Sequence, residues 1–230
     1  MKALVIAHRG ASGTEVENSL AAFRAAGPQG ADAVELDVHA TADGALMVHH
    51  DATMDGRQHI SRLSERSVRE HRLSNGEPIP TLAQALDAIG PLLRVFVEVK
   101  TLDPRWDDRL LETFDAGPNP SGYAVHSFAS HIIRRLGDKR PALPRGILSE
   151  AYPRHPRTAL QSVGASMLWQ ERSVVDEVLV RAVHSAGAGV IIWTVDDPAE
   201  MARLLAWGVD GICTNFPERG RRVVDAPQAA

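Results

Sequence analysis

The sequence has little cysteine. Cys213 is the one cysteine among 230 residues, so no disulfide can form within the chain. The stability of the fold therefore does not depend on an oxidising compartment. Cys213 ends a stretch, Gly-Val-Asp-Gly-Ile-Cys, that is typical of a late β-strand, and a buried structural thiol is the favoured interpretation.

Long apolar runs and an excess of one charge are also missing. Ala3–Ala7 is too short for the core of a signal peptide, and no stretch approaches the roughly 20 apolar residues of a membrane span. The 25 Lys and Arg against 29 Asp and Glu give a net charge of −4, which argues against a nucleic-acid partner. We expect a cytoplasmic protein without a membrane span, and nothing in the sequence indicates its oligomeric state.

The chain does contain a repeated alternation of short β-like and helix-like runs. This alternation predicts parallel strands joined by crossover helices. The candidate strands are Leu4–Ala7, Ala33–Val38, Val95–Lys100, Ala124–Phe128, Gly146–Leu148, Ser166–Trp169, Val190–Val195 and Gly211–Cys213. Candidate helices include Asn18–Ala26, Thr81–Ile89, Ser130–Leu136, Val175–Ala186 and Pro198–Trp207, with Asn18 and Thr81 as possible caps.

Eight such units favour a closed (β/α)8 TIM barrel, which typically has about 250 residues. We therefore predict a single barrel domain over residues 1–230, with an open doubly wound sheet as the structural alternative. The segment between Ala33 and His50 is too short for a helix, and Asp43-Gly44 predicts a hairpin extension after the second strand. If those two residues form the turn, Asp37 faces His50.

Three predicted strands end in polar residues: His8 and Arg9 on the first, Glu35 and Asp37 on the second, and Glu98 and Lys100 on the third. The spacing of two in the second and third pairs places both side chains of each pair on one face of the strand. Carboxyl ends of barrel strands form the active-site face. Glu35, Asp37 and Glu98 should therefore converge at the barrel mouth together with Lys100, Arg9 and His8. Three carboxylates need compensating charge, and oxygen ligands in that number favour Mg²⁺ or Ca²⁺ over zinc.

The cationic residues of these strand ends indicate an anionic substrate. Arg9 offers a planar fork for phosphate and Lys100 a point charge. His8 and His50 can exchange protons near neutral pH. A divalent metal, two cations and two imidazoles together suit phosphoryl transfer. No role is assigned to four other histidines: His39, His59, His71 and His184.

At this point the residues match a known family, because the chain resembles the glycerophosphodiester phosphodiesterases over nearly its whole length. The first 51 residues carry the most specific part of the resemblance. The matching stretches are Ala-His-Arg-Gly-Ala-Ser at 7–12, Glu17-Asn18, the run 31–38, Thr41-Ala42-Asp43-Gly44, Val48-His49-His50-Asp51, Ile79-Pro80-Thr81-Leu82, the run 97–100, Ser127-Phe128, Trp193-Thr194-Val195 and the run 208–217.

The resemblance implies a role for each matching residue. His8 and His50 would be the acid–base pair, and Arg9 and Lys100 would bind the phosphate. Trp193 would line the pocket, with a core aromatic as the alternative. The metal ligands would be Glu35, Asp37 and Glu98. There are departures from the family pattern: Val16 replaces a proline, Asp55-Gly56 replaces an arginine, and the late Thr-Asp pair is Thr214-Asn215.

The implied reaction is metal-dependent hydrolysis of a small glycerophosphodiester to glycerol 3-phosphate and an alcohol such as choline, ethanolamine or glycerol. Two alternatives stay open. The first is a lysophospholipase D-type enzyme on the same barrel, which would need an exposed apolar lip for acyl chains. The second is a catalytically silent barrel that binds phosphodiesters. The metal, Mg²⁺ or Ca²⁺, and the roles of the two histidines are not distinguished by the sequence.

Overall fold

A computed structural model describes residues 2–226. In this part of the chain, eight parallel strands form a closed barrel, because β1 pairs with both β11 and β2. The eight strands are β1 (Leu4–His8), β2 (Ala33–Ala40), β6 (Arg94–Thr101), β7 (Tyr123–Ser127), β8 (Arg145–Ser149), β9 (Met167–Glu171), β10 (Gly189–Trp193) and β11 (Gly211–Thr214). The predicted single-domain (β/α)8 barrel is confirmed, and the open sheet is excluded. The extent of the domain to residues 1 and 230 stays a prediction, because these ends lie outside the described residues.

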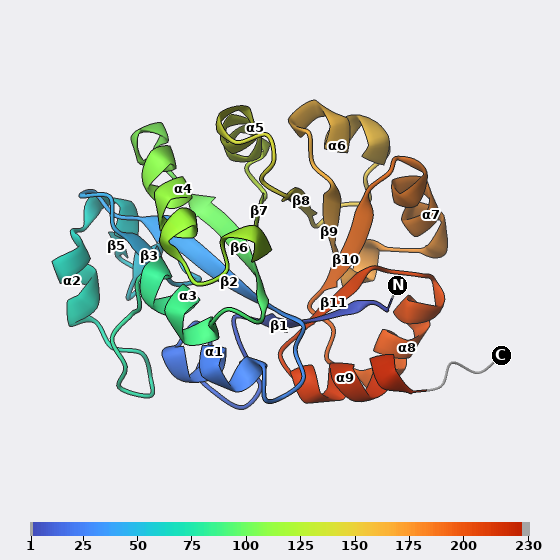
Figure 1. The fold of residues 1–230 in the computed structure, drawn as a ribbon, viewed down its shortest axis with the longest axis horizontal. Helices are drawn as coiled ribbons and strands as arrows, with labels where there is room; N and C mark the ends of the chain where they lie inside the picture. Colours follow the sequence, from blue (N-terminus) through green and yellow to red (C-terminus); the bar gives the residue numbers. More distant parts are fainter. Residues whose placement is uncertain (1, 227–230) are drawn as a thin grey trace.

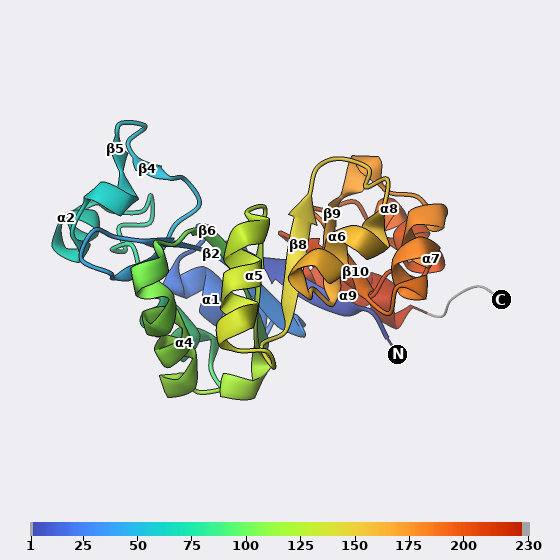
Figure 2. The ribbon, with the colours of Figure 1, turned by 90° about the horizontal axis from the view of Figure 1, so that it is seen from above.

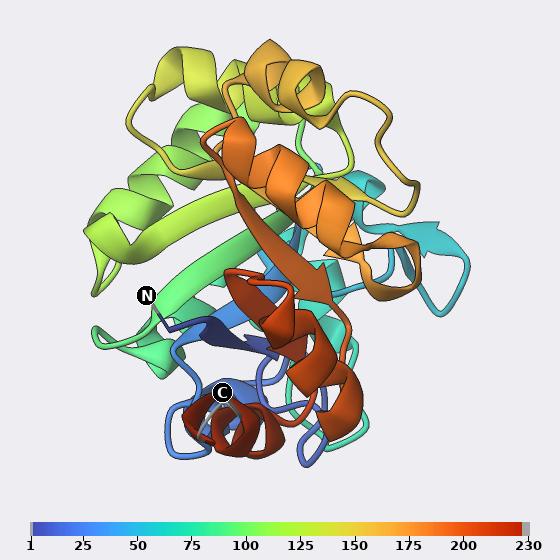
Figure 3. The same cartoon turned by 90° about the vertical axis from the view of Figure 1, so that its right-hand side faces the viewer.

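The helices surround the strands, as Figures 1 and 3 show. They are α1 (Leu20–Ala26), α2 (Glu65–Glu70), α3 (Leu82–Ile89), α4 (Asp107–Ala116), α5 (Ser130–Lys139), α6 (Pro156–Val163), α7 (Glu177–Ser185), α8 (Pro198–Ala206) and α9 (Pro217–Asp225). None of the helices between residues 2 and 226 has the length and apolar character to cross a bilayer.

Local side-chain bonds explain where several helices begin. Thr81 and Gln84 form a reciprocal capping box at the start of α3, which confirms Thr81 as a cap. The first helix differs from the prediction, because Ser19 Oγ, and not Asn18, accepts the bond from the Ala22 amide. Asn18 has a positive φ of 55° and turns its side chain to the barrel mouth instead.

The predicted hairpin exists, but its register is shifted by one residue. Strand β3 (Leu46–Val48) runs antiparallel to β2, with Val38 opposite Val48. The Thr41 amide donates to the Ala45 carbonyl at 2.9 Å, so three residues, and not two, form the turn. Asp37 therefore lies level with His49, whose amide donates to the Asp37 carbonyl at 3.1 Å, and the predicted pairing of Asp37 with His50 is wrong.

A small extension follows β3 on one side of the barrel. It holds the short strands β4 (Thr53–Met54) and β5 (Gln58–His59) and the helix α2, which Figure 2 shows projecting from the end of the molecule that carries the hairpin. Met47, Met54, Ile60, Val68 and Ile79 form a separate apolar cluster beneath it. Met47 and Met54 of this cluster lie on either side of His50 in the sequence, so the cluster anchors the chain before and after that residue.

The barrel interior explains why the polar strand ends meet. Each of the eight strands contributes one buried apolar side chain to a single interior cluster: Ile6, Ala33, Phe96, Ala124, Leu148, Trp169, Ile191 and Cys213. Successive residues of a strand alternate between its faces. The residue two positions further on therefore shares the interior face, one layer closer to the mouth. Cys213 is fully buried in this cluster, and burial raises the pKa of its thiol well above the usual value.

One buried ion pair between helices provides a test of the outer layer. Arg135 on α5 donates to both carboxylate oxygens of Asp107 on α4, at 2.7 and 2.9 Å, and Asp107 is fully buried. Asp107→Ala leaves a partly buried guanidinium without its partner, so the free energy of unfolding should fall by about 3 kcal/mol in urea denaturation. Asp108→Ala, which removes the exposed pair with Lys139, should cost less than about 1 kcal/mol. Equal losses in the two variants would contradict this account.

Candidate active site

A pocket of about 190 Å³ lies at the carboxyl ends of the strands. Seven of the eight predicted site residues line this pocket: His8, Arg9, Glu35, His50, Glu98, Lys100 and Trp193. The eighth, Asp37, is 1% exposed and contacts two of the residues that line it. The structure therefore brings all eight predicted residues together.

Asp37 lies between two cations. Its Oδ2 is 3.1 Å from Arg9 Nε, and its Oδ1 is 3.2 Å from Lys100 Nζ. Asn18 Nδ2 donates to the same Oδ2 at 2.9 Å. Burial favours the protonated carboxyl, but Lys100 and Arg9 outweigh it and hold the pKa of Asp37 below its usual value. Asp37 is therefore a stable anion inside the protein.

Glu35 and Glu98 are compensated less completely. Burial, together with the nearby Asp37 charge, raises the pKa of Glu98 to about 7 despite Lys100 Nζ at 2.9 Å from its Oε1. Burial and the charges of Asp37 and Glu98 raise the pKa of Glu35 well above its usual value. Glu35 Oε2 accepts a bond from the Arg9 amide at 3.1 Å. The positive charge near Glu35 and Glu98 is therefore too small to keep their pKa values at the usual level.

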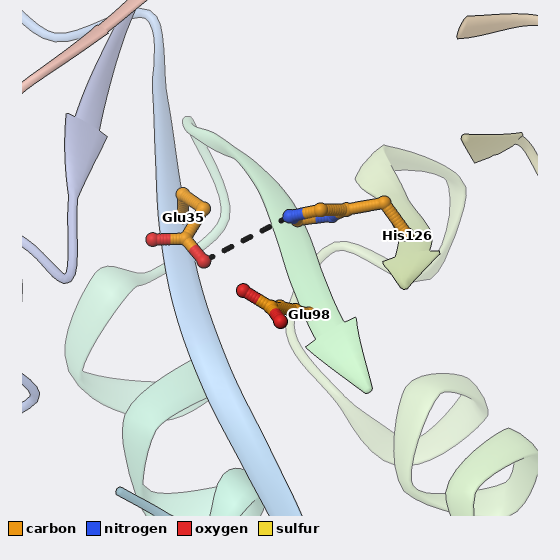
Figure 4. Close-up of side chains that lie close together, drawn as sticks. All are labelled: Glu35, Glu98 and His126. Atoms are coloured by element: carbon orange, nitrogen blue, oxygen red, sulfur yellow. Dashed lines mark ion pairs between the residues drawn. The ribbon is translucent and has the colours of Figure 1, made fainter. Parts of the chain in front are cut away.

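His126 lies beside these two carboxyl groups, as Figure 4 shows. Ligand atoms of Glu35, Glu98 and His126 lie within 4.8 Å of one another, so this buried group could hold a metal ion. His126 Nε2 is 3.8 Å from Glu35 Oε1, and the ring stacks on Trp169 with centroids 4.1 Å apart. Burial lowers the pKa of His126 to about 3, so its ring is neutral at physiological pH. Two carboxyl groups with too little nearby positive charge, beside a neutral imidazole, are suited to bind a divalent cation.

The backbone at Arg9 takes an unusual conformation that serves the site. Arg9 has a φ of 55°, and Gly10, with a φ of 81°, passes so close to Ala22 that an added Cβ would lie 2.6 Å from a backbone carbon. This turn aims the Arg9 amide at Glu35 while its side chain contacts Asp37 and Glu17, the latter at 2.8 Å. Left-handed non-glycine residues cost free energy and cluster at functional sites.

The two predicted catalytic histidines have different partners. His8 Nδ1 is 2.8 Å from Asn215 Oδ1, an amide oxygen, whereas His50 Nδ1 is 2.8 Å from Asp51 Oδ1, a carboxylate oxygen. Burial and the neighbouring Arg9 charge lower the pKa of His8. The bond to His50 holds the pKa of Asp51 below its usual value, so this partner is an anion.

An aromatic wall closes one side of the pocket. Trp193 follows Ile191 by two residues on β10, and its ring meets Phe128 edge-on, with centroids 5.9 Å apart. Trp193 also packs against the interior cluster. The two interpretations of Trp193, pocket wall and core aromatic, therefore both describe its position.

Several residues of the site were not identified in the sequence. His126 follows Ala124 by two residues, so the spacing rule that found Glu98 after Phe96 would also have found it. His39 was assigned no role, yet it is buried and bridges Thr101 Oγ1 at 3.0 Å and the His50 carbonyl at 3.2 Å. Burial lowers the pKa of His39 to about 4, which makes it a neutral support for the His50 backbone. No local sequence signal marks the contact between His39 and the His50 carbonyl.

Comparisons with known proteins agree with this geometry. The model of the glycerophosphoryl diester phosphodiesterase family matches residues 8–219. A glycerophosphodiester phosphodiesterase from Caldanaerobacter subterraneus is 33% identical over 95% of this chain and 96% of its own length. One from Bacillus subtilis is 28% identical over 96% of this chain and 86% of its own length.

Solved structures show the same barrel. An Oleispira antarctica phosphodiesterase in complex with the product sn-glycerol-3-phosphate superposes with a TM-score of 0.89, at 26% identity and with 98% of each chain covered. A Parabacteroides distasonis glycerophosphodiester phosphodiesterase superposes with a TM-score of 0.88, at 28% identity and with 97% of each chain covered. The fold and the site thus define a barrel phosphodiesterase. The chain belongs to the glycerophosphodiester phosphodiesterase family and is a phosphoric diester hydrolase.

The raised pKa of Glu98 predicts how the stability of the metal-free protein depends on pH. Below about pH 4.5, Glu98 is protonated in both the folded and unfolded states; between that pH and about 7 the folded state holds a proton that the unfolded state releases. Stability contributed by this group is therefore lost as pH rises from about 4.5 to about 7. Glu98→Gln removes this loss. In EDTA, the melting temperature of the variant minus that of the wild type should therefore rise between pH 5 and pH 8.

A matched variant separates this effect from a general change in charge. Glu70→Gln removes a carboxylate that is 70% exposed on α2 and 3.7 Å from Arg66. Its melting temperature relative to wild type should stay nearly constant across the same pH range, because exposed ion pairs contribute little to stability. A pH-independent difference between Glu98→Gln and wild type would contradict the raised pKa of Glu98.

Proposed function

We propose that the protein is a metal-dependent hydrolase of small glycerophosphodiesters that uses His8 and His50 as its acid–base pair. The products are glycerol 3-phosphate and an alcohol such as choline, ethanolamine or glycerol. The observation that carries this proposal is the meeting of two histidines, two cations and buried carboxylates in one pocket. The product named in the Oleispira antarctica complex supports it.

The proposed cation is Mg²⁺ or Ca²⁺, held by Glu35, Asp37 and Glu98, with His126 beside them. A bound divalent cation supplies Lewis-acid polarisation of the phosphoryl oxygen. The raised pKa values of Glu35 and Glu98 support this assignment, since deprotonating both carboxyls in a buried site requires added positive charge. Asp37 accepts a hydrogen bond from Asn18 and forms ion pairs with Arg9 and Lys100, so its position is fixed before any ligand binds.

Arg9 and Lys100 bind the phosphate of the substrate in this proposal. Both side chains line the pocket and are less than one-fifth exposed, at 17% and 18%. Low exposure strengthens their interaction with an anion, because water screens the charges less. Their carboxylate partners hold the two cations at the pocket wall and so reduce the ordering that substrate binding requires.

His8 and His50 move the protons. Each ring uses Nδ1 for a protein partner, which leaves Nε2 of both rings available to the pocket that they line. One ring removes a proton from the attacking oxygen, which comes from water or from a glycerol hydroxyl, and the other protonates the departing alcohol. The phosphate lies between them. Where a glycerol hydroxyl attacks, water then opens the cyclic phosphate that forms and gives glycerol 3-phosphate.

The alternative of a lysophospholipase D-type activity receives less support. Among residues 2–226, the exposed large apolar side chains are Leu92, Phe128, Tyr152 and Val178. Of these four, Phe128 alone lines the pocket, so the described rim offers little apolar surface for an acyl chain. The complete set of acid–base, phosphate-binding and carboxylate residues also disfavours a silent binding protein.

Turnover of the single-site variants tests the acid–base pair. Release of glycerol 3-phosphate from glycerophosphocholine and glycerophosphoethanolamine should need Mg²⁺ or Ca²⁺ and stop in EDTA. His8→Ala and His50→Ala should each lower kcat at least about 100-fold, because each removes a proton-transfer group. His59→Ala, on the exposed strand β5, is the control and should keep full activity. Circular dichroism should show folded protein in all three, and near-normal turnover by either active-site variant would refute its role.

Calorimetry without substrate tests the metal ligands. Glu98→Gln and Glu35→Gln should each weaken binding of Mg²⁺ or Ca²⁺ by more than about 10-fold. Loss of a residue that only supports a ligand already weakens metal binding by about 10-fold or more, and loss of a ligand should weaken it at least as much. Glu150→Gln is the matched control, because Glu150 lines the same pocket but lies outside the buried Glu35, Glu98 and His126 group. An unchanged affinity in Glu98→Gln would remove it from the ligand set.

A further inference from the structure

A chain of hydrogen bonds runs behind His8. Asn215, which follows β11, has its Oδ1 2.8 Å from His8 Nδ1, and its Nδ2 donates to Asp196 Oδ2 at 2.7 Å. Asp196 follows β10, so the chain connects three strand ends that are neighbours in the barrel. Neither Asn215 nor Asp196 lines the pocket, and the reaction proposed above does not use them.

The Asp196 carboxylate is fixed by its other bonds. Its Oδ1 accepts from Thr214 Oγ1 at 2.9 Å and from the Asn215 amide at 2.8 Å. An ionised carboxylate only accepts hydrogen bonds. The side-chain amide of Asn215 must therefore turn its Nδ2 toward Asp196, because the flipped amide would place two acceptor oxygens 2.7 Å apart.

This orientation decides which nitrogen of His8 carries the proton. Asn215 Oδ1 has no hydrogen to give, so His8 Nδ1 must be the donor in their bond. In the neutral ring, the lone pair then lies on Nε2. No hydrogen-bond partner of His8 Nε2 is found within residues 2–226, and His8 lines the pocket. The lone pair is therefore available to the substrate.

We propose that Asn215 and Asp196 are positioning residues that hold His8 in the Nδ1–H tautomer and so make it the base of the reaction. This inference rests on the proposed two-histidine hydrolysis. His8 Nε2 takes a proton of the attacking water as the water oxygen bonds to phosphorus. The bond from phosphorus to the alcohol oxygen breaks, and that oxygen takes a proton from Nε2 of protonated His50. Solvent then carries a proton from His8 back to His50, which closes the cycle.

The partner of His50 supports the opposite role for that ring. Asp51 places a carboxylate oxygen, and not an amide oxygen, at 2.8 Å from His50 Nδ1. A charged acceptor stabilises an imidazolium more than a neutral one does. The Nδ1 partner of His8 is thus a neutral amide, and that of His50 is a charged carboxylate. This difference favours His8 as the proton acceptor and His50 as the proton donor.

The ¹⁵N spectrum of the histidines, recorded without substrate or metal, tests the tautomer directly. In the wild-type protein at a pH where His8 is neutral, Nδ1 of His8 should show the shift of a protonated nitrogen and Nε2 that of an unprotonated one. Comparison with His8→Gln assigns the signals. A protonated Nε2 in the neutral wild-type ring would overturn the proposal. Because no turnover is needed, this result is independent of whether the protein releases glycerol 3-phosphate, and a failure to release it would refute the proposed function instead.

Variants of the chain test its effect on turnover. Asn215→Ala should mix the two His8 tautomers and lower kcat roughly 100-fold, with KM within about threefold. Asn215→Asp should also lose activity, because it places two carboxylates at hydrogen-bond distance. The double variant Asp196→Asn/Asn215→Asp restores one donor and one acceptor between the two positions and should recover kcat to within about tenfold of wild type. Its His8 signals should keep the Nδ1–H pattern.

A neighbouring carboxylate provides the control. Asp197 is exposed and accepts a bond from the Glu200 amide at 2.8 Å as the cap of α8. Asp197→Asn should keep both the His8 spectrum and kcat. Wild-type kcat in Asn215→Ala, or a double variant no more active than Asn215→Asp, would overturn the positioning role of Asn215 and Asp196.

Discussion

The ion pairs of Asp37 with Arg9 and Lys100 are the interaction on which the whole site depends. A carboxylate that is 1% exposed is tolerated as an anion only when opposite charges meet it directly. Arg9 reaches Asp37 because β1 closes the barrel against β2, and Lys100 reaches it because β6 pairs with β2 on the other side. Closure of the barrel is therefore what brings both cations to Asp37.

The same arrangement leaves more carboxyl groups than cations at the barrel mouth. Three carboxyl groups meet two cations at the mouth, and Asp37 contacts both of them, at 3.1 Å from Arg9 Nε and 3.2 Å from Lys100 Nζ. Burial and the neighbouring carboxylates raise the pKa of Glu35 well above its usual value and that of Glu98 to about 7. A site that must hold protons to stay neutral is one that a divalent cation can bind by displacing them, so metal affinity should depend on pH through these two groups. The neutral His126 adds a donor atom without adding charge.

Much of this site followed from the alternation of strand residues alone. Glu35, Asp37, Glu98 and Lys100 were placed at the mouth because residues two apart share a strand face, and the closed barrel confirms that placement. The register of the hairpin could not be obtained in the same way, since the Thr41 hydroxyl accepts a bond from the Ala45 amide and the turn takes one more residue than Asp43-Gly44 alone implies. The cap of the first helix was misassigned for a different reason. Asn18 is bonded to Asp37, 19 positions away, and such a long-range partner has no local signature.

The two histidines show most clearly what three dimensions add. In the sequence, His8 and His50 are each a histidine beside a polar residue, and nothing ranks one as acid and the other as base. In the fold, His50 meets the next residue, Asp51, whereas His8 meets an amide from the opposite end of the chain, 207 positions away. His39 adds a further asymmetry, because its Nε2 must donate to the His50 carbonyl, an acceptor, so its Nδ1 accepts from Thr101. The backbone of His50 is thus held by a neutral ring, and the charge that contacts the His50 side chain comes from Asp51 at its Nδ1.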